Sequence, residues 1–274
     1  KTLGERTYGT DAGKEGETPN GDWRNIGILM SNVKNFSISN LTIVDSHCWA
    51  ISLEYCSYGK LENLSFRSTG SKMIDGKNET ILNQDGIDLR RGCHDIIIDG
   101  VRGYTGDDLV ALTSIPTAKP VKAGRYGSTA VSGSEMPGYS NDIYNVIIKN
   151  VLGYCAGGHH IVRFLNTRKA KLHNISLDTL VDTSPEGFSC YAAVKIGDSN
   201  PAYGGHTELG YTYAITVRNV QSKAKRAIFI GSSLTDSIIN SIINQNPEAE
   251  TIFYGAGKEN TRNLIISEIV EMGK

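Results

Sequence analysis

Short apolar segments recur along the whole chain, and most of them begin with an asparagine or an aspartate. The seven clearest begin at Asn35, Asn63, Asp95, Asn145, Asn174, Ala214 and Asn263. A second apolar segment follows each of the first six, for example at 86–89 and at 160–164. Short apolar runs bounded by turn residues predict β-strands, and no segment carries the 3.6-residue period of an amphipathic helix. The hydrophobic pattern therefore predicts repeated pairs of short strands.

The repeat length is uneven, which indicates loops inserted into a regular scaffold. Asn35, Asn63 and Asp95 are spaced by 28 and 32 residues, whereas the longer gaps contain insertions at about 115–142 and 197–211. We predict one all-β domain across residues 1–274, a single-stranded right-handed parallel β-helix of about eight coils stacked ~4.8 Å apart.

Two details of this prediction concern the ends and the turns of the coils. Residues 1–25 carry little strand signal, so we expect a poorly defined N-terminal segment that lacks an upstream cap. The recurring asparagine is expected to form an internal ladder, with its side-chain amides hydrogen-bonded from coil to coil.

The composition fits a folded protein and narrows its partners. The chain holds 28 Lys and Arg against 29 Asp and Glu, and 30 of its 274 residues are glycine. It lacks the basic excess of a nucleic-acid-binding groove, and no apolar run approaches the roughly 18 residues of a membrane-spanning helix. The five cysteines show no Cys-x-x-Cys spacing, which argues against a zinc site or a disulfide framework. We expect a monomer with no nucleic-acid or membrane partner, no cofactor and no metal.

Aligning the second strand of each pair brings ionisable residues of consecutive coils to one position. The strands are aligned on Ile51, Ile87, Val110, Ile161, Val194 and Ile228. The residues that this alignment places together are Asp85, Asp107, Asp108 and His159, with Lys195 from a fourth coil. Asp88 and Asp99 are interpreted as ordinary turn or surface residues.

This cluster has the composition of an acid–base site. Carboxylates on adjacent coils would lie about 5 Å apart, so their charges repel and the pKa of one should rise. Glycosidases use such a pair, with one acid kept protonated and one base kept ionised. Asp-Gly and Gly-Asp-Asp also suit simple turns, but convergence of three adjacent coils on one place favours catalysis. A neighbouring His would set the protonation of the network, and a Lys would bind an anionic substrate group.

The same residues resemble the motifs of glycoside hydrolase family 28, the polygalacturonases and their relatives. The matching segments are Ser46-His-Cys-Trp49, Asn83-Gln-Asp85-Gly-Ile-Asp88, Thr105-Gly-Asp107-Asp108 and Gly158-His159-His160, in the order of the family. The resemblance extends from about Trp23 to Lys195 and implies a β-helix fold. It implies that Asp107 is the general acid, that Asp85 and Asp108 activate water with inversion, and that His159 tunes the acid. Lys195 would contact a sugar carboxylate.

Three positions depart from the family pattern. Gln84 replaces the usual Thr, and His160 replaces the second Gly of Gly-His-Gly. Ala193 stands where the Arg of Arg-Ile-Lys is expected, and Lys195 alone gives no bidentate contact with a carboxylate. Arg163 or Arg168 would have to supply the guanidinium. The predicted substrate-binding residues are Lys195, His160, Arg163 and Gln84.

Two other functions remain open. A calcium-dependent polysaccharide lyase would bind Ca²⁺ through Asp85, Asp88, Asp107 and Asp108, with Lys195 as the base. A non-catalytic carbohydrate-binding β-helix would use exposed aromatic residues alone, and the two insertions are rich in tyrosine. A pectin-like polysaccharide is the substrate that the resemblance implies, and an extracellular polymer implies a secreted or periplasmic location.

Overall fold

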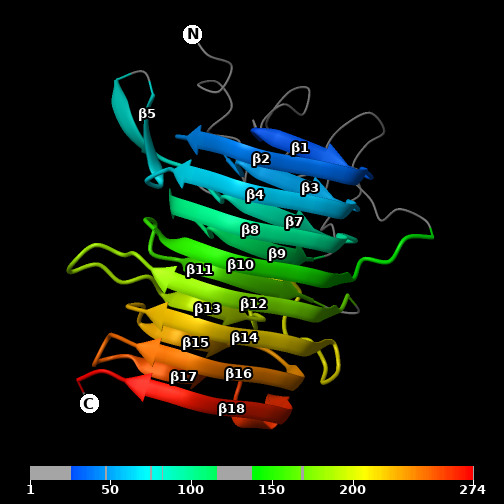
Figure 1. Cartoon of the computed structure of the whole chain (residues 1–274), viewed down its shortest axis with the longest axis vertical. Coiled ribbons are helices and arrows are strands. Elements are labelled where there is room, and N and C mark those ends of the chain that lie inside the picture. The colour runs from blue at the N-terminus through cyan, green and yellow to red at the C-terminus, as the bar shows by residue number, and fades with distance from the viewer. Residues whose placement is uncertain are drawn as a thin grey trace.

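The chain folds into two stacked parallel sheets of eight strands each. The computed structural model describes residues 26–46, 48–74, 76–81, 83–115, 138–167 and 170–273. A third sheet is an antiparallel hairpin of β5 (Ser71–Ile74) and β6 (Lys77–Thr80), which stands away from the stack in Figure 1. The predicted N-terminal segment 1–25 and residues 116–137 of the first insertion lie outside the described residues.

The chain alternates between the two large sheets as it advances. The first sheet contains β1 (Ile28–Ser31), β3 (Ile51–Glu54), β7 (Ile87–Arg90), β9 (Val110–Ser114), β11 (His160–Asn166), β13 (Ala192–Ile196), β15 (Arg226–Ile230) and β17 (Glu250–Tyr254). The second sheet contains β2 (Lys34–Val44), β4 (Ser57–Arg67), β8 (His94–Thr105), β10 (Ile143–Cys155), β12 (Leu172–Asp182), β14 (Thr212–Ser222), β16 (Leu234–Asn244) and β18 (Thr261–Glu271).

Every pairing within the two large sheets is parallel and joins successive turns of the chain. The fold is therefore a right-handed parallel β-helix, as the repeats predict. Within the described ranges the chain also forms two short 3₁₀ turns, Pro201–Tyr203 and Lys258–Asn260. Among the described residues no helix is long and apolar enough to cross a membrane.

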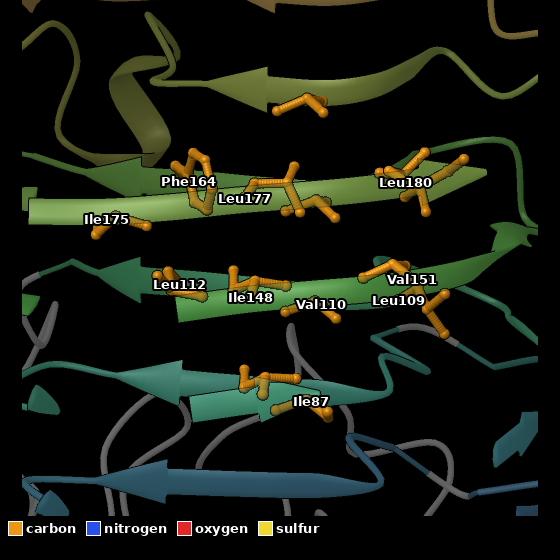
Figure 2. Packing of buried hydrophobic residues seen from close by; sticks show 14 of the residues in the cluster. Ile87, Leu109, Val110, Leu112, Ile148, Val151, Phe164, Ile175, Leu177 and Leu180 are labelled. Carbon is orange, nitrogen blue, oxygen red and sulfur yellow. The ribbon is translucent and has the colours of Figure 1, made fainter. Parts of the chain in front are cut away.

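The core lies between the two sheets and consists of stacked aliphatic side chains. Inward-facing residues of successive coils are in register, for example Ile87 with Val110 and Val162 with Val194. Figure 2 shows members of this core from both sheets, and all its labelled residues are almost completely buried. Burial of each such side chain contributes about 1.5–3 kcal/mol to stability. The β-branched side chains of Ile and Val suit this stacking on the pleated sheet.

The recurring asparagines mark two columns in which the backbone of the second sheet bends. All sixteen residues of these columns have φ between 49° and 76°, the left-handed region that Asn, Asp and Gly tolerate best. The first column is Asn35, Tyr58, Asp95, Asn145, Asn174, Ala214, Asp236 and Asn263, and the second is Asn40, Asn63, Gly100, Asn150, Thr179, Asn219, Ser241 and Glu268.

Side-chain amides in these columns hydrogen-bond between coils, but on the outer surface. Asn63 Nδ2 donates to Asn40 Oδ1 at 2.8 Å, and Asn174 Nδ2 donates to Asn145 Oδ1 at 3.2 Å, both exposed to solvent. The ladder is thus present, whereas its predicted internal position is wrong. Asn63 also belongs with Asn40 rather than with Asn35, because the register pairs Leu41 with Leu64.

Candidate active site

The predicted carboxylates converge where two neighbouring strands of the first sheet begin. Asp85 lies just before β7, and Asp107 and Asp108 lie just before β9. Because β7, β9 and β11 are paired in parallel, these starting points are stacked from coil to coil. Asp85, Asp107 and Asp108 each offer an oxygen atom within 4.8 Å of the others. The sequence therefore placed these three side chains correctly.

The register differs from the sequence alignment at β11. Val162, not Ile161, pairs with Val110 and with Val194. His160 therefore occupies the position next to Asp108, and its Nδ1 atom lies 2.8 Å from Asp108 Oδ1, to which its backbone N–H also donates at 3.2 Å. His159, which the alignment placed there, is exposed and donates its own backbone N–H to Cys155 Sγ. Its predicted role in tuning the acid stays a prediction.

Asp107 and Asp108 are adjacent in sequence but have opposite electrostatic environments. Burial, reinforced by the charge of Asp108, raises the pKa of Asp107 to about 6. Burial also acts to raise the pKa of Asp108, but His160 and Arg163 outweigh it and lower the pKa of Asp108 to about 2. At pH 4 to 5, Asp107 is therefore mostly protonated while Asp108 is ionised, which is the division of labour that acid–base catalysis needs.

Burial raises the pKa of two further carboxyl groups of the site. Burial raises the pKa of Asp85 well above its ordinary value, and the charges of Asp88, Asp107 and Asp108 add to this effect. Burial likewise raises the pKa of Asp88 to about 8. Asp88 is only 1% exposed and lies on the strand itself. Its interpretation as a turn or surface residue is wrong, because the Asp85-Gly-Ile-Asp88 segment enters a strand.

Gln84 is fully buried and holds the turns beneath the carboxylates. Its Nε2 donates to the carbonyl of Ser46 at 2.6 Å, and its Oε1 accepts from the backbone N–H of Gly70 at 2.7 Å. Its own carbonyl accepts from the backbone N–H groups of Gly106 and Asp107. Gln84 therefore positions the turn that carries Asp107, in place of the substrate contact that the sequence predicted for it.

Three glycines from successive coils stack directly beside these carboxylates. A Cβ at Gly157 would overlap the carbonyl oxygen of Gly106, and a Cβ at Gly106 would overlap Gly70 and the side chain of Gln84. Only glycine allows this approach, because the obstacles are backbone atoms of the neighbouring coil. The close stacking of these glycines fixes the distance between the turn that carries Asp107 and the turns of the two neighbouring coils.

Gly157→Ala is therefore expected to displace the Asp107 turn and to lower kcat by roughly 10²-fold, since a shift of about 1 Å at a catalytic group has this effect. Steady-state hydrolysis rates would measure the loss. Gly187→Ala is the comparison variant: a Cβ at Gly187 meets no atom within 4 Å, and because its φ is 74° this variant reports the cost of backbone strain without a steric overlap. Full activity of a folded Gly157→Ala protein would show that the stacking does not position Asp107.

The two predicted substrate-binding cations lie side by side on the two strands that follow β9 in the first sheet. Arg163 of β11 pairs with Lys195 of β13, and both side chains are largely buried. Arg163 Nη1 lies 3.6 Å from Asp108 Oδ2, and Arg163 Nη2 donates to Asp198 Oδ2 at 2.9 Å. Lys195 Nζ donates to the same oxygen of Asp198 at 2.6 Å. Asp198 was not identified from the sequence.

Ala193, where the family pattern has an arginine, is fully buried in the hydrophobic core. Arg163, one of the two candidates for the missing guanidinium, lies on the adjacent coil, where it pairs with Lys195. Arg168, the other candidate, lies outside the described residues. The guanidinium of Arg163 stacks over Tyr203 at 5.1 Å, which brings the second insertion against the site. On the opposite side, Arg90 stacks over Trp49 at 4.7 Å.

Fold and side chains together bring three carboxylates and two cations to one place on a parallel β-helix. Residues 11–162, just over half of the chain, match the family described as Glycosyl hydrolases family 28. The chain belongs to this family.

A solved structure with a similar fold is that of a hyperthermoactive exopolygalacturonase from Thermotoga maritima, with 17% sequence identity and a TM-score of 0.53. The match covers 89% of this chain and 54% of that chain, so this chain spans about half the length of the solved protein. No curated protein sequence matches the chain.

Proposed function

We propose that the chain is an inverting glycoside hydrolase that cleaves glycosidic bonds in pectin-like plant polysaccharide. The observation that carries this proposal is the meeting of Asp85, Asp107 and Asp108 within 4.8 Å at the start of two adjacent strands, β7 and β9. Membership of glycosyl hydrolase family 28 supports the reaction class, and the exopolygalacturonase fold supports a pectic substrate.

In the proposed mechanism the two neighbouring aspartates act as acid and base. Asp107, protonated because its pKa is raised to about 6, donates its proton to the glycosidic oxygen as the bond to the anomeric carbon breaks. Asp108, ionised because its pKa is lowered to about 2, takes a proton from the attacking water. The water oxygen forms the new bond to the anomeric carbon, which becomes a hemiacetal, and the leaving oxygen becomes a hydroxyl group. Proton exchange with solvent then returns Asp107 to its protonated form and Asp108 to its ionised form.

Asp85 and His160 assist the base in this mechanism. Asp85, whose pKa is raised well above its ordinary value by burial, is a weaker candidate for the base than Asp108, so in this mechanism Asp85 positions the water and leaves the proton transfer to Asp108. The Nδ1 atom of His160, 2.8 Å from Asp108 Oδ1, orients the carboxylate of the base. His160 is thus proposed as a positioning residue, where the sequence suggested a substrate contact.

The stereochemical outcome needs its own measurement. Inverting glycosidases usually hold their two carboxyl groups about 6.5–9.5 Å apart, whereas retaining enzymes hold them about 5–5.5 Å apart. The 4.8 Å limit here joins the nearest oxygens of three carboxyl groups, and it does not by itself distinguish these cases. Inversion is proposed from the family resemblance, and the anomer of the first product, observed by NMR, decides it.

The reaction class is tested by product mass spectrometry on a panel of pectic glycans in heavy-oxygen water, with and without a chelator. Incorporation of heavy oxygen that does not depend on the chelator supports hydrolysis. An unsaturated, unlabelled and chelator-sensitive product would instead support the calcium-dependent lyase, the second candidate, because three clustered carboxylates can hold a cation. Binding without turnover on a responsive glycan would support the non-catalytic carbohydrate-binding protein.

The hydrolysis rate should show a bell-shaped dependence on pH. Asp107 must be protonated, so kcat falls as the pH rises through about 6. Asp108 must be ionised, so kcat falls as the pH drops through about 2. The expected optimum lies between these limits, and initial rates from pH 2 to 9 measure both limbs. A rate that keeps rising above pH 7 would contradict the assignment of Asp107 as the acid.

An extracellular polymer as substrate favours a secreted or periplasmic protein, and a monomer suffices because all proposed site residues come from one chain. Both statements are part of the proposal. Detection of the native protein in the culture medium or periplasmic fraction tests the first. Light scattering tests the second.

A further inference from the structure

The two cations of the site share a single acidic partner. Lys195 Nζ and Arg163 Nη2 both donate to Asp198 Oδ2, at 2.6 and 2.9 Å. Asp198 follows β13 directly, at the start of the insertion that extends to residue 211. Asp198 Oδ2 therefore lies between two adjacent coils, at the position where a bound anion would contact both Lys195 and Arg163.

Asp198 is fixed in this place and ionised. Its Oδ1 accepts from the backbone N–H of Asn200 at 2.9 Å, and the residue is only 8% exposed. Burial acts to raise the pKa of Asp198, but the hydrogen bonds from Lys195 and Asn200 and the charge of Arg163 outweigh it and lower the pKa. Tyr203, from the same insertion, packs on the guanidinium of Arg163 and holds it toward Asp198.

The charges of this part of the site already cancel. Arg163 and Lys195 carry two positive charges, and Asp198 and Asp108 carry two negative charges within 3.6 Å of them. A substrate carboxylate bound here would have to displace Asp198 and would approach the ionised Asp108. Like charges brought together in a buried site repel each other strongly, whereas hydroxyl groups of an uncharged sugar meet no such repulsion.

We propose that Asp198 occupies the carboxylate-binding position of Arg163 and Lys195 and thereby selects a sugar unit that carries no charge over these two residues. This proposal rests on the proposed hydrolase function and names the charge of one sugar unit of its substrate. Specificity by a repulsive group placed against the wrong ligand is a common device. The opposite role for Asp198, orienting both cations toward a substrate carboxylate, makes the opposite prediction.

Binding measurements separate these roles without relying on turnover. The probes are a short oligogalacturonate and its fully methyl-esterified form, which share a backbone and differ in charge. Titration calorimetry is carried out in the Asp107→Asn background, so that neither probe is consumed. Asp198→Asn keeps the shape and the Oδ1 acceptor but removes the charge. Asp178→Asn is the matched control, since Asp178 pairs with Arg218 on the second sheet, at 2.7 Å.

Asp198→Asn is expected to tighten binding of the charged probe at least about tenfold and to change binding of the esterified probe less than about threefold. Asp178→Asn should change neither. Unchanged or weaker binding of the charged probe to Asp198→Asn would overturn the proposal, as would failure of both probes to bind. Failure of the hydrolase function is a separate result, detected as absence of labelled product from the unmodified chain.

Discussion

Replacement of Asp107 by Asn is expected to reduce kcat by about 10²–10⁴-fold, the usual contribution of a general acid. The amide cannot protonate the leaving oxygen, whereas its shape preserves the acceptor for the backbone N–H of Asp108 at 3.1 Å. Binding of the polysaccharide should change little, so the loss should appear in kcat rather than in KM. Initial rates on the responsive glycan measure it.

Asp99→Asn is the matched control for this loss. Asp99 lies on β8 of the second sheet and bonds to Asn150 at 2.7 Å and to Lys149 at 3.1 Å, on the opposite face of the β-helix. Its replacement should leave kcat unchanged. Turnover of Asp107→Asn within about threefold of the unmodified chain would move the acid to another residue, with Asp85 the first to examine.

Replacement of Arg91 by Met is expected to lower the free energy of unfolding by about 3–5 kcal/mol, because it takes a buried cation away from the buried charge of Glu54. Arg91 Nε donates to Glu54 Oε1 at 2.8 Å, and the two side chains are 2% and 1% exposed. Arg91 also lies 5.6 Å from the ring of Tyr55. Denaturant unfolding followed by circular dichroism measures the change.

A double-mutant comparison identifies the cause of this loss. Glu54→Gln together with Arg91→Met removes both charges and should recover part of the stability, because the penalty comes from the buried charge that loses this cation rather than from lost contacts. Glu62→Gln is the exposed control. It breaks a pair with Lys60 whose side chains are 37% and 49% exposed, and should cost at most about 1 kcal/mol. Equal losses in the buried and exposed pairs would contradict the argument.

The repeats were sufficient to predict the β-helix, because inward-facing Ile and Val recur wherever a coil returns to the same sheet. The register of β11 was harder, since Ile161 and Val162 are both apolar and both fully buried. The alternation of apolar and charged residues around Arg163 would have indicated the correct register. Val162 and Phe164 flank this arginine and face the core, so aligning on Ile161 would have put a charged residue inside.

The convergence of the carboxylates was predictable because Asp85 and Asp108 each stand two residues before the first residue of an apolar strand. Asp198 was not, because its Gly197-Asp198-Ser sequence has the composition of an ordinary turn. Its contact with Arg163 depends on how the insertion folds back across two coils, and nothing local in the sequence records that path. Asp88 was missed for a related reason, since a second aspartate after Asp-Gly resembles turn chemistry.

The asparagine ladder of the second sheet also bears on the choice of expression host. Asn63 and Asn174 each begin an Asn-x-Ser sequence, the acceptor for N-linked glycans in secretory pathways. Their Nδ2 atoms donate to the neighbouring coil, and a glycan would be attached to that same nitrogen. A host that glycosylates these sites would therefore compete with the coil-to-coil hydrogen bonds, whereas a host without this modification leaves every amide of the ladder available.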